Sequence, residues 1–202
     1  MAQTVLDKEA RRQQLLDAAI KAFARKGYLE TSIDDIISEA DVARGTFYLY
    51  FSGKKEIFLA IIDRYFELVS DLVHRFMAEE WPAQLDRARF REHVLTWLRF
   101  FAQHRNLAKV IYREATSIDP QFEARWSRLS DTVKSFLIER VRTLQRDGVL
   151  RETLDPQAWA LFMEGIFHAA ICNYILSSER PDLEWLADQW VDFVLWGISE
   201  NK

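Results

Sequence analysis

Residues 31–54 read TSIDDIISEADVARGTFYLYFSGK, and this stretch decides the fold. Ser32 stands where a helix N-cap stands, and Asp35 three positions later completes a capping box in which Asp replaces the usual Glu or Gln. Asp41 interrupts the apolar spacing that follows, and Asp tolerates a left-handed turn conformation. A second short element begins near Arg44. Two short helices joined by a tight turn predict a helix-turn-helix, whose second helix enters the major groove of DNA.

The composition favours a globular all-α protein with a substantial core. Of the 202 residues 49% are hydrophobic, and only 6 are glycine and 4 proline. Runs of β-branched residues bounded by turn signals are absent, so we expect helices rather than strands. No apolar run reaches the roughly 18–20 residues that span a membrane. The start, MAQTVLDKEARRQQ, lacks the apolar segment of a secretory signal, and Cys172 is the one cysteine, so we expect a cytoplasmic protein.

The charge balance does not support DNA binding. The net charge is −4; residues 1–55 carry 9 Lys/Arg and 8 Asp/Glu, and the remainder carries 18 and 23. Which face carries the charge matters more than the sum. We expect one face to carry the basic residues Arg44, Lys54 and Lys55, and the acidic residues to face elsewhere, namely Asp34, Asp35 and Glu39.

Apolar residues at helical spacing extend in both directions from the helix-turn-helix. A first helix is predicted over about 8–26, with Gly27 as its stop. After the motif, helices are predicted over about 54–79, ended by Trp81-Pro82, then 86–103, 106–115, 119–148, 156–178 and 181–197. The prediction is therefore a nine-helix, all-α protein, with a three-helix DNA-binding domain at 1–55 and a larger helical effector-binding and dimerisation domain at 56–202.

The first 60 or so residues resemble the DNA-binding domain of the TetR family of transcriptional regulators. The resemblance rests on an ordered set of elements: Lys26-Gly27-Tyr28, Thr31-Ser32, Val42-x-Arg44-Gly45-Thr46-Phe47-Tyr48-x-Tyr50-Phe51, and Lys54 leading into an apolar helix. Two positions depart from the family pattern, Asp41 where the turn usually has Gly and Ala43 where the recognition helix usually has a Ser-like cap. Losing that cap costs about 0.5–2 kcal/mol in helix stability.

The resemblance implies which residues touch DNA. Arg44 and Thr46 become candidates for base contact, since Arg bonds guanine bidentately and the Thr methyl touches thymine. Gly45 allows a close approach of the backbone. Phosphate contacts are expected from Tyr48, Tyr50, Lys54 and the helix start at Ser32. Phe47 and Phe51 are expected in the core.

The last two long helices are apolar on more than one face, more than an internal core requires. The resemblance implies that they form a four-helix homodimer interface, because two half-sites must be read together. The predicted interface residues are Trp159, Met163, Phe167, Tyr174, Leu186, Trp190 and Phe193. Burial inside one chain is the alternative.

The middle helices are rich in aromatic residues, and the resemblance implies that they enclose a pocket for a hydrophobic or amphipathic small molecule. The predicted effector-binding residues are Trp97, Phe101, His104, Tyr112, Phe122, Trp126 and Phe162. A basic group at 104–113 is a candidate site for the anionic end of a fatty acid or acyl-CoA, with a solvated helix face as the alternative; it comprises His104, Arg105, Lys109 and Arg113.

Catalysis is not expected. The four histidines lack metal-site spacing, a Gly-rich phosphate loop is absent, and Cys172 stands mid-helix among small apolar residues. We therefore expect no catalytic residue, no metal site and no cofactor. The predicted function is a DNA-binding transcriptional regulator, a repressor released from its operator by the effector. The alternative is a nucleoid-associated or structural DNA-binding protein without an effector.

Overall fold

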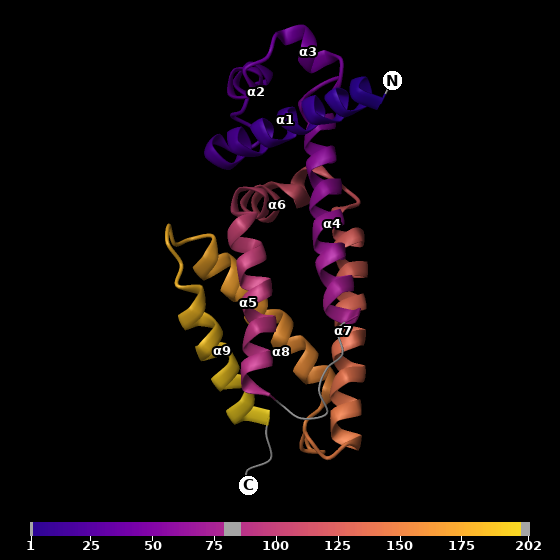
Figure 1. Cartoon of the computed structure of the whole chain (residues 1–202), viewed down its shortest axis with the longest axis vertical. Helices are drawn as coiled ribbons and strands as arrows, with labels where there is room; N and C mark the ends of the chain where they lie inside the picture. Colours follow the sequence, from indigo (N-terminus) through magenta and orange to yellow (C-terminus); the bar gives the residue numbers. More distant parts are fainter. Residues whose placement is uncertain (1, 79–85, 199–202) are drawn as a thin grey trace. The chain divides into compact units, whose positions relative to one another are not determined.

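The computed structural model describes residues 2–78 and 86–198 (Figure 1). Over these residues the chain is built from helices, which confirms the all-α, nine-helix prediction. In chain order they are α1 (Ala2–Lys26), α2 (Ile33–Ala40), α3 (Arg44–Tyr48), α4 (Lys54–Ala78), α5 (Arg87–Gln103), α6 (Arg105–Ile118), α7 (Phe122–Arg146), α8 (Pro156–Ala169), its π-helical continuation η1 (Ala170–Ile175), and α9 (Leu183–Ile198). The predicted stop at Trp81-Pro82 lies outside the described residues.

The chain forms two compact units. The N-terminal unit comprises the residues up to Val69 together with Asn106–Glu123, and the second unit comprises Ser70–Arg105 and the residues from Ala124 onward. Three helices therefore belong to both units: α4 passes from the first into the second, α6 begins in the second and continues in the first, and α7 begins in the first and continues in the second. The functional division between 1–55 and 56–202 remains a prediction, since compactness does not test it.

Local sequence signals set the ends of α2. The Asp35 amide donates to Ser32 Oγ (3.1 Å), and Asp35 Oδ2 accepts from the Ser32 amide (2.9 Å), so the predicted capping box is present. Asp41 has φ 50° and ψ 55°, the predicted left-handed turn. Gln14 of α1 donates to the carbonyl of Ala40 (2.7 Å), which ties the other end of α2 to α1.

An aromatic core joins the helices of the N-terminal unit. The rings of Phe23, Tyr28 and Phe58 pack mutually, with centroids 4.9–5.6 Å apart. Phe47 and Phe51 are buried, as predicted, and their centroids lie 6.0 Å apart. The short helix α3 is therefore held by burial of its inner residues, because Ala43 makes no side-chain cap.

The first residue of α4 fastens the turn between α1 and α2. Lys54 Nζ donates to the carbonyls of Tyr28 (2.7 Å), Leu29 (3.1 Å) and Thr31 (2.8 Å) and lies 4.5 Å from the centroid of the Tyr28 ring. We call these contacts of Lys54 the lysine clamp. Gly27, the residue that follows α1, has φ 84°, a conformation that favours glycine.

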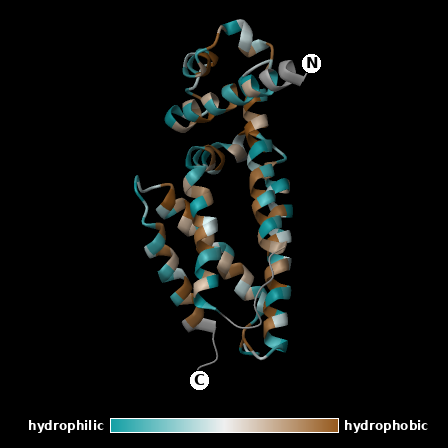
Figure 2. Cartoon of the chain, in the orientation of Figure 1, coloured by the Kyte–Doolittle hydropathy of each residue, from teal (hydrophilic) through white to brown (hydrophobic). Residues whose placement is uncertain are grey.

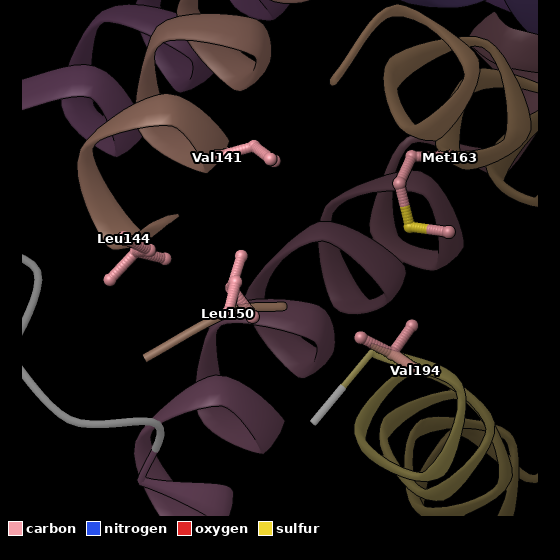
Figure 3. Packing of buried hydrophobic residues seen from close by; sticks show 5 residues of the cluster. All are labelled: Val141, Leu144, Leu150, Met163 and Val194. Carbon is pink, nitrogen blue, oxygen red and sulfur yellow. The ribbon is translucent and has the colours of Figure 1, made fainter. Parts of the chain in front are cut away.

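The second unit has its own apolar core. Figure 3 shows Val141 and Leu144 of α7, Leu150, Met163 of α8 and Val194 of α9 lying together, and all five are buried. These residues are far apart in sequence, so the core ties α7, α8 and α9 to one another. Figure 2 shows the matching pattern of hydrophobic bands alternating with hydrophilic ones along the helices.

Ion pairs hold α9 beside α5 (Figure 1). Three arginines of α5 face three carboxylates of α9 at helical spacing, with nitrogen–oxygen distances of 2.7–3.2 Å; the residues are Arg87, Arg91, Arg99, Glu184, Asp188 and Asp192. Hydrogen bonds to these carboxylates raise the pKa of Arg91 above its ordinary value. The pairs are largely exposed, so they fix the orientation of α9 more than they stabilise the fold.

Helix α8 changes from α-helical to π-helical winding at its C-terminal end. η1 continues α8 with the wider π-helical turn, and the Leu176 amide donates to the carbonyl of Ile171 (2.9 Å). Arg105, the first residue of α6, donates to the carbonyls of Leu176 (2.8 Å) and Ser178 just beyond η1. Helix α6 begins at Arg105, one residue before the predicted start at 106, and extends to Ile118, past the predicted end at 115.

The capping box predicts a pH-dependent stability. A hydrogen bond from Lys26 Nζ (2.6 Å), followed by those from Ser32, lowers the pKa of Asp35 well below its ordinary value of 3.8. The stabilisation is therefore complete above about pH 4 and is lost as the pH falls through the lowered value. We expect Asp35→Asn to lower the thermal midpoint at pH 7, with a difference from the unmodified protein that shrinks below about pH 4. Glu30→Gln, at an exposed carboxylate in the preceding turn, should show no such pH-dependent difference.

The lysine clamp predicts a difference between two adjacent lysines. Lys54→Met keeps the apolar stem but leaves three carbonyls without their donor, so the free energy of unfolding should fall by about 1.5–3 kcal/mol. Lys55→Met, at an exposed neighbour, should stay within about 0.5 kcal/mol. Urea unfolding followed by circular dichroism measures both. Equal effects of the two substitutions would contradict the structural role of the clamp.

Candidate DNA interface

The recognition helix α3 exposes one face and buries the other. Arg44, Gly45 and Tyr48 are exposed, whereas the Phe47 side chain is fully buried. A Cβ added at Gly45 would meet nothing within 4 Å, so the backbone there is open. The exposed face therefore offers a guanidinium, a phenol and accessible backbone, the groups that contact bases and phosphates.

Arg44 is already engaged in the DNA-free protein. Its Nη1 lies 2.6 Å from Asp34 Oδ1, and its Cζ lies 5.9 Å from the centroid of the Tyr48 ring. We had expected Asp34 to face away from Arg44, and that expectation was wrong. Asp34 follows the N-cap of α2 by two positions, which places its carboxylate within reach of the start of α3. The other two acidic residues pair with α1: Asp35 with Lys26, and Glu39 with Arg25.

The other residues predicted to contact DNA differ in their exposure and in the hydrogen bonds that they already make within the protein. Thr46 and Tyr50 are half-buried, and Ser32 is exposed at the start of α2 with its hydroxyl committed to the capping box. Lys54 is half-buried and donates to three carbonyls. The sequence suggested a phosphate anchor at Lys54, and the contact that the structure shows is with the protein's own backbone. Lys55, next to it, is exposed.

The predicted effector-binding residues are distributed over both compact units. Trp97 and Phe101 lie in the second unit, with ring centroids 5.2 and 5.4 Å from that of Phe167. Tyr112 and Phe122 lie in the N-terminal unit, where Phe122 is buried 5.5 Å from the Phe66 ring.

Three further effector predictions fall in the second unit. His104 stacks beside Phe100 (4.7 Å), and Trp126 is half-buried. The Phe162 side chain is 62% exposed, so its assignment to an internal pocket is corrected.

An aromatic cluster in the second unit is the best-defined part of the predicted pocket. Phe76 packs edge to face against Trp97 (5.6 Å) and Phe136 (5.5 Å), and Phe167 joins Trp97 to Trp190 (6.0 Å). The Trp190 Nε1 donor is buried without a hydrogen-bond partner in the described chain. Such a donor beside aromatic walls is the kind of group that orients a ligand.

The predicted basic group is not a single anion site. Arg105 donates to two backbone carbonyls in the second unit, and Arg113 pairs with Glu114 (3.2 Å) in the N-terminal unit. Lys109 is exposed. The guanidinium of Arg105 therefore has a structural partner instead of the expected anionic ligand.

The predicted dimer residues are divided between the core and the surface. Met163 lies in the core of the second unit and Trp159 and Trp190 pack against it, while Phe167 faces the aromatic cluster. Tyr174 lies 5.7 Å from the Trp185 ring, and Leu186 is half-buried. Phe193 alone among the seven is a strongly exposed apolar side chain, at 67%.

Other residues of α8 and α9 form the exposed apolar face that periodicity did not single out. Leu161, Phe162 and Trp185 are 60%, 62% and 50% exposed, and a Cβ at Gly165 would meet nothing within 4 Å. We call this set, with Phe193, the α8–α9 face. Its signal in the sequence is the excess of apolar residues; which of two apolar stripes faces outward depends on tertiary packing.

Two observations concern metal binding and membrane insertion. Within residues 2–78 and 86–198, no group of three or more His, Cys, Asp or Glu side chains is placed to hold a metal ion. One described stretch, Pro156–Ile175, is long and apolar enough to cross a membrane by length and composition, and only 28% of it is buried in the chain. That stretch comprises α8 and η1, and α8 carries two of the four large side chains of the α8–α9 face, Leu161 and Phe162.

The chain is similar to bacterial transcriptional regulators. A family model described as "Bacterial regulatory proteins, tetR family" matches residues 15–61, which run from the middle of α1 into the first part of α4. The HTH-type transcriptional regulator TtgR of Pseudomonas putida is 27% identical over 90% of this chain and 88% of that protein. A probable acrEF/envCD operon repressor of Escherichia coli is 26% identical over 91% and 84%.

A solved structure shows the same fold. The fatty acid degradation regulator FadR from Bacillus halodurans superposes with a TM-score of 0.71 and 21% identity, covering 93% of this chain and 95% of that one. The match of the family model to the helix-turn-helix, the relatives along most of the chain and the shared all-α architecture agree. Residues 15–61 therefore carry the DNA-binding domain described by the TetR family model, and the chain is a DNA-binding transcriptional regulator.

Proposed function

We propose that this protein binds operator DNA as a homodimer through α3 and is a repressor released by a hydrophobic or amphipathic small molecule. The observation that carries the proposal is the two-sided character of α3. Phe47 anchors the helix in the core, while Arg44, Gly45 and Tyr48 lie exposed on the opposite side. Arg44 and Thr46 would read bases, and Tyr48 and Tyr50 would bind phosphates. Such a regulator would act in the cytoplasm, where the chromosome of a bacterium lies.

The α8–α9 face supports a homodimer. Four large apolar side chains and an open glycine lie on a helix pair whose other side is already committed to the core and to the ion pairs with α5. A second copy would cover this face with an identical one, as a two-fold interface requires. Two recognition helices would then meet half-sites about one helical turn, roughly 34–36 Å, apart.

The aromatic cluster of the second unit supports an apolar effector. Its walls are Phe76, Trp97, Phe136 and Phe167, and the Trp190 Nε1 group supplies a polar donor. One relative is named an operon repressor and one structural neighbour a fatty acid degradation regulator, which suits repression and an acyl-type ligand. A fatty acid or acyl-CoA would bind with its chain against these rings.

The ends of α6 suggest how an effector would alter DNA binding. In the second unit α6 begins at Arg105, whose guanidinium donates hydrogen bonds to the carbonyls of Leu176 and Ser178, just after η1. In the N-terminal unit Glu114 of α6 accepts from the Tyr28 amide (3.4 Å), and the Tyr28 carbonyl is held by the lysine clamp. Tyr28 is thus fixed from α6 and from α4. An effector that favours another setting of either helix would change how α2 and α3 are presented, and the ligand must prefer one of the two settings.

The dimer proposal predicts the effect of a charge at Gly165. Because a side chain there meets nothing within one chain, Gly165→Glu should fold normally but prevent close association of two α8 helices. We expect a monomer by light scattering and loss of cooperative operator binding. Leu29→Glu, which places the same charge at an exposed leucine outside α8 and α9, should remain dimeric. A folded Gly165→Glu dimer, or a monomeric unmodified protein, would contradict the interface.

The effector proposal predicts ligand-dependent release from DNA. Fluorescence anisotropy of a labelled duplex selected by the protein from a random pool, titrated with fatty acids, acyl-CoAs and apolar drugs, should find a ligand that weakens binding at least fivefold. Glu114→Gln should reduce that effect while leaving ligand binding unchanged, because it weakens the link from α6 to Tyr28.

The same titration separates the two candidate functions. A ligand that binds without changing DNA affinity would refute the regulation, and failure of every ligand to bind would favour the nucleoid-associated alternative. Loss of ligand binding itself in Glu114→Gln would contradict a role confined to the link.

A further inference from the structure

Asp34 occupies an unusual place for an acidic residue in a DNA-binding surface. It lies in the first turn of α2, 70% exposed, with Oδ1 2.6 Å from Nη1 of Arg44, which is 61% exposed. The carboxylate contacts only this one nitrogen of the guanidinium. The guanidinium has further N–H donors that Asp34 leaves available, and these can bind guanine O6 and N7.

Helix stability gives a reason for an acidic residue here but not for this contact. A negative charge in the first turn of a helix is favourable, and Asp35 already provides one with both capping hydrogen bonds. Asp34 takes no part in the capping box, and its carboxylate accepts a hydrogen bond from Arg44, the candidate base reader.

The contact also has an electrostatic consequence. A free guanidinium binds any phosphate on any DNA, whereas a guanidinium paired with a carboxylate presents a neutralised group to the backbone. An approaching phosphate would be repelled by Asp34 as it is attracted by Arg44. A guanine edge carries only partial charges and is repelled far less than a phosphate, so the pairing favours bases over phosphates as partners of Arg44.

We propose that Asp34 is a specificity-determining residue: it orients Arg44 toward a base and disfavours its contact with phosphate. The proposal rests on the role of Arg44 as a reader within the proposed function. The Tyr48 ring, with its centroid 5.9 Å from Arg44 Cζ, is a second neighbour of the guanidinium. Because the ion pair is exposed, it is weak enough to rearrange when DNA binds.

The test compares the duplex that the unmodified protein selects from a random pool with an unrelated duplex of equal length. We expect Asp34→Asn to bind the unrelated duplex about 3–10-fold more tightly, to gain at most slightly on the selected one, and to lower the ratio of the two affinities. Since Arg44 would then be free to neutralise a phosphate, the salt slope on the unrelated duplex should steepen by about 0.9. Asp34→Ala should behave in the same way, and circular dichroism checks that α2 is intact.

Asp41→Asn is the matched control. It removes one negative charge from the same motif at a left-handed position that Asn accepts, and Asp41 has no contact with Arg44. The ratio of affinities should be unchanged in this variant. If Asp34→Asn raises both affinities equally, as the control does, or changes neither, the specificity role is refuted.

Variants of Arg44 separate this inference from the proposed function. Arg44→Ala should relax the sequence preference, and adding Asp34→Asn to it should change the preference no further, because Asp34 acts through Arg44. A preference unaffected by Arg44→Ala would refute the reader assignment in the proposed function. A preference that depends on Arg44 but falls again in the double variant would leave the reader in place and refute the inference about Asp34.

Discussion

The burial of Phe47 is the constraint on which the DNA-binding surface depends. A helix of five residues is far too short to persist by itself, and α3 lacks a side-chain cap at Ala43. Its conformation comes from packing: the Phe47 ring is fully buried beside Phe51, and the Arg12 guanidinium lies over Phe51 at 5.4 Å. The exposed polar groups of α3 are therefore positioned by an apolar residue that cannot itself touch DNA.

Signals that act within a few residues were readable from the sequence. The Ser32–Asp35 capping box, the left-handed Asp41 and the glycine stop at Gly27 were predicted because each depends on local backbone chemistry. The predicted helix start at 156 was confirmed, with Asp155 Oδ1 accepting from the Ala158 amide as the cap of α8. These signals, with helical periodicity, were enough to predict an all-α chain and its order of helices.

Contacts between distant residues were not readable. Periodicity gave two apolar stripes on α8 but not which one faces the core, and so it assigned the buried Met163 to the surface and the exposed Phe162 to a pocket. Long flexible side chains were the other difficulty. Lys54 and Arg44 could each have several partners by sequence, and the structure gives them a set of carbonyls and a carboxylate. Only three-dimensional proximity selects among such partners.

The π-helical segment η1 has a consequence for how this chain tolerates change in length. A π-helical turn accommodates one residue more than an α-helical turn, and such segments behave as single-residue insertions within a helix. In this chain the extra residue is absorbed between Ala170 and Ile175, with Ile171 and Ile175 still fully buried. Deleting one residue here would therefore restore regular winding without misplacing the residues before Ala170. The segment thus marks the place where this helix should tolerate a change of one residue in length with least effect on the core.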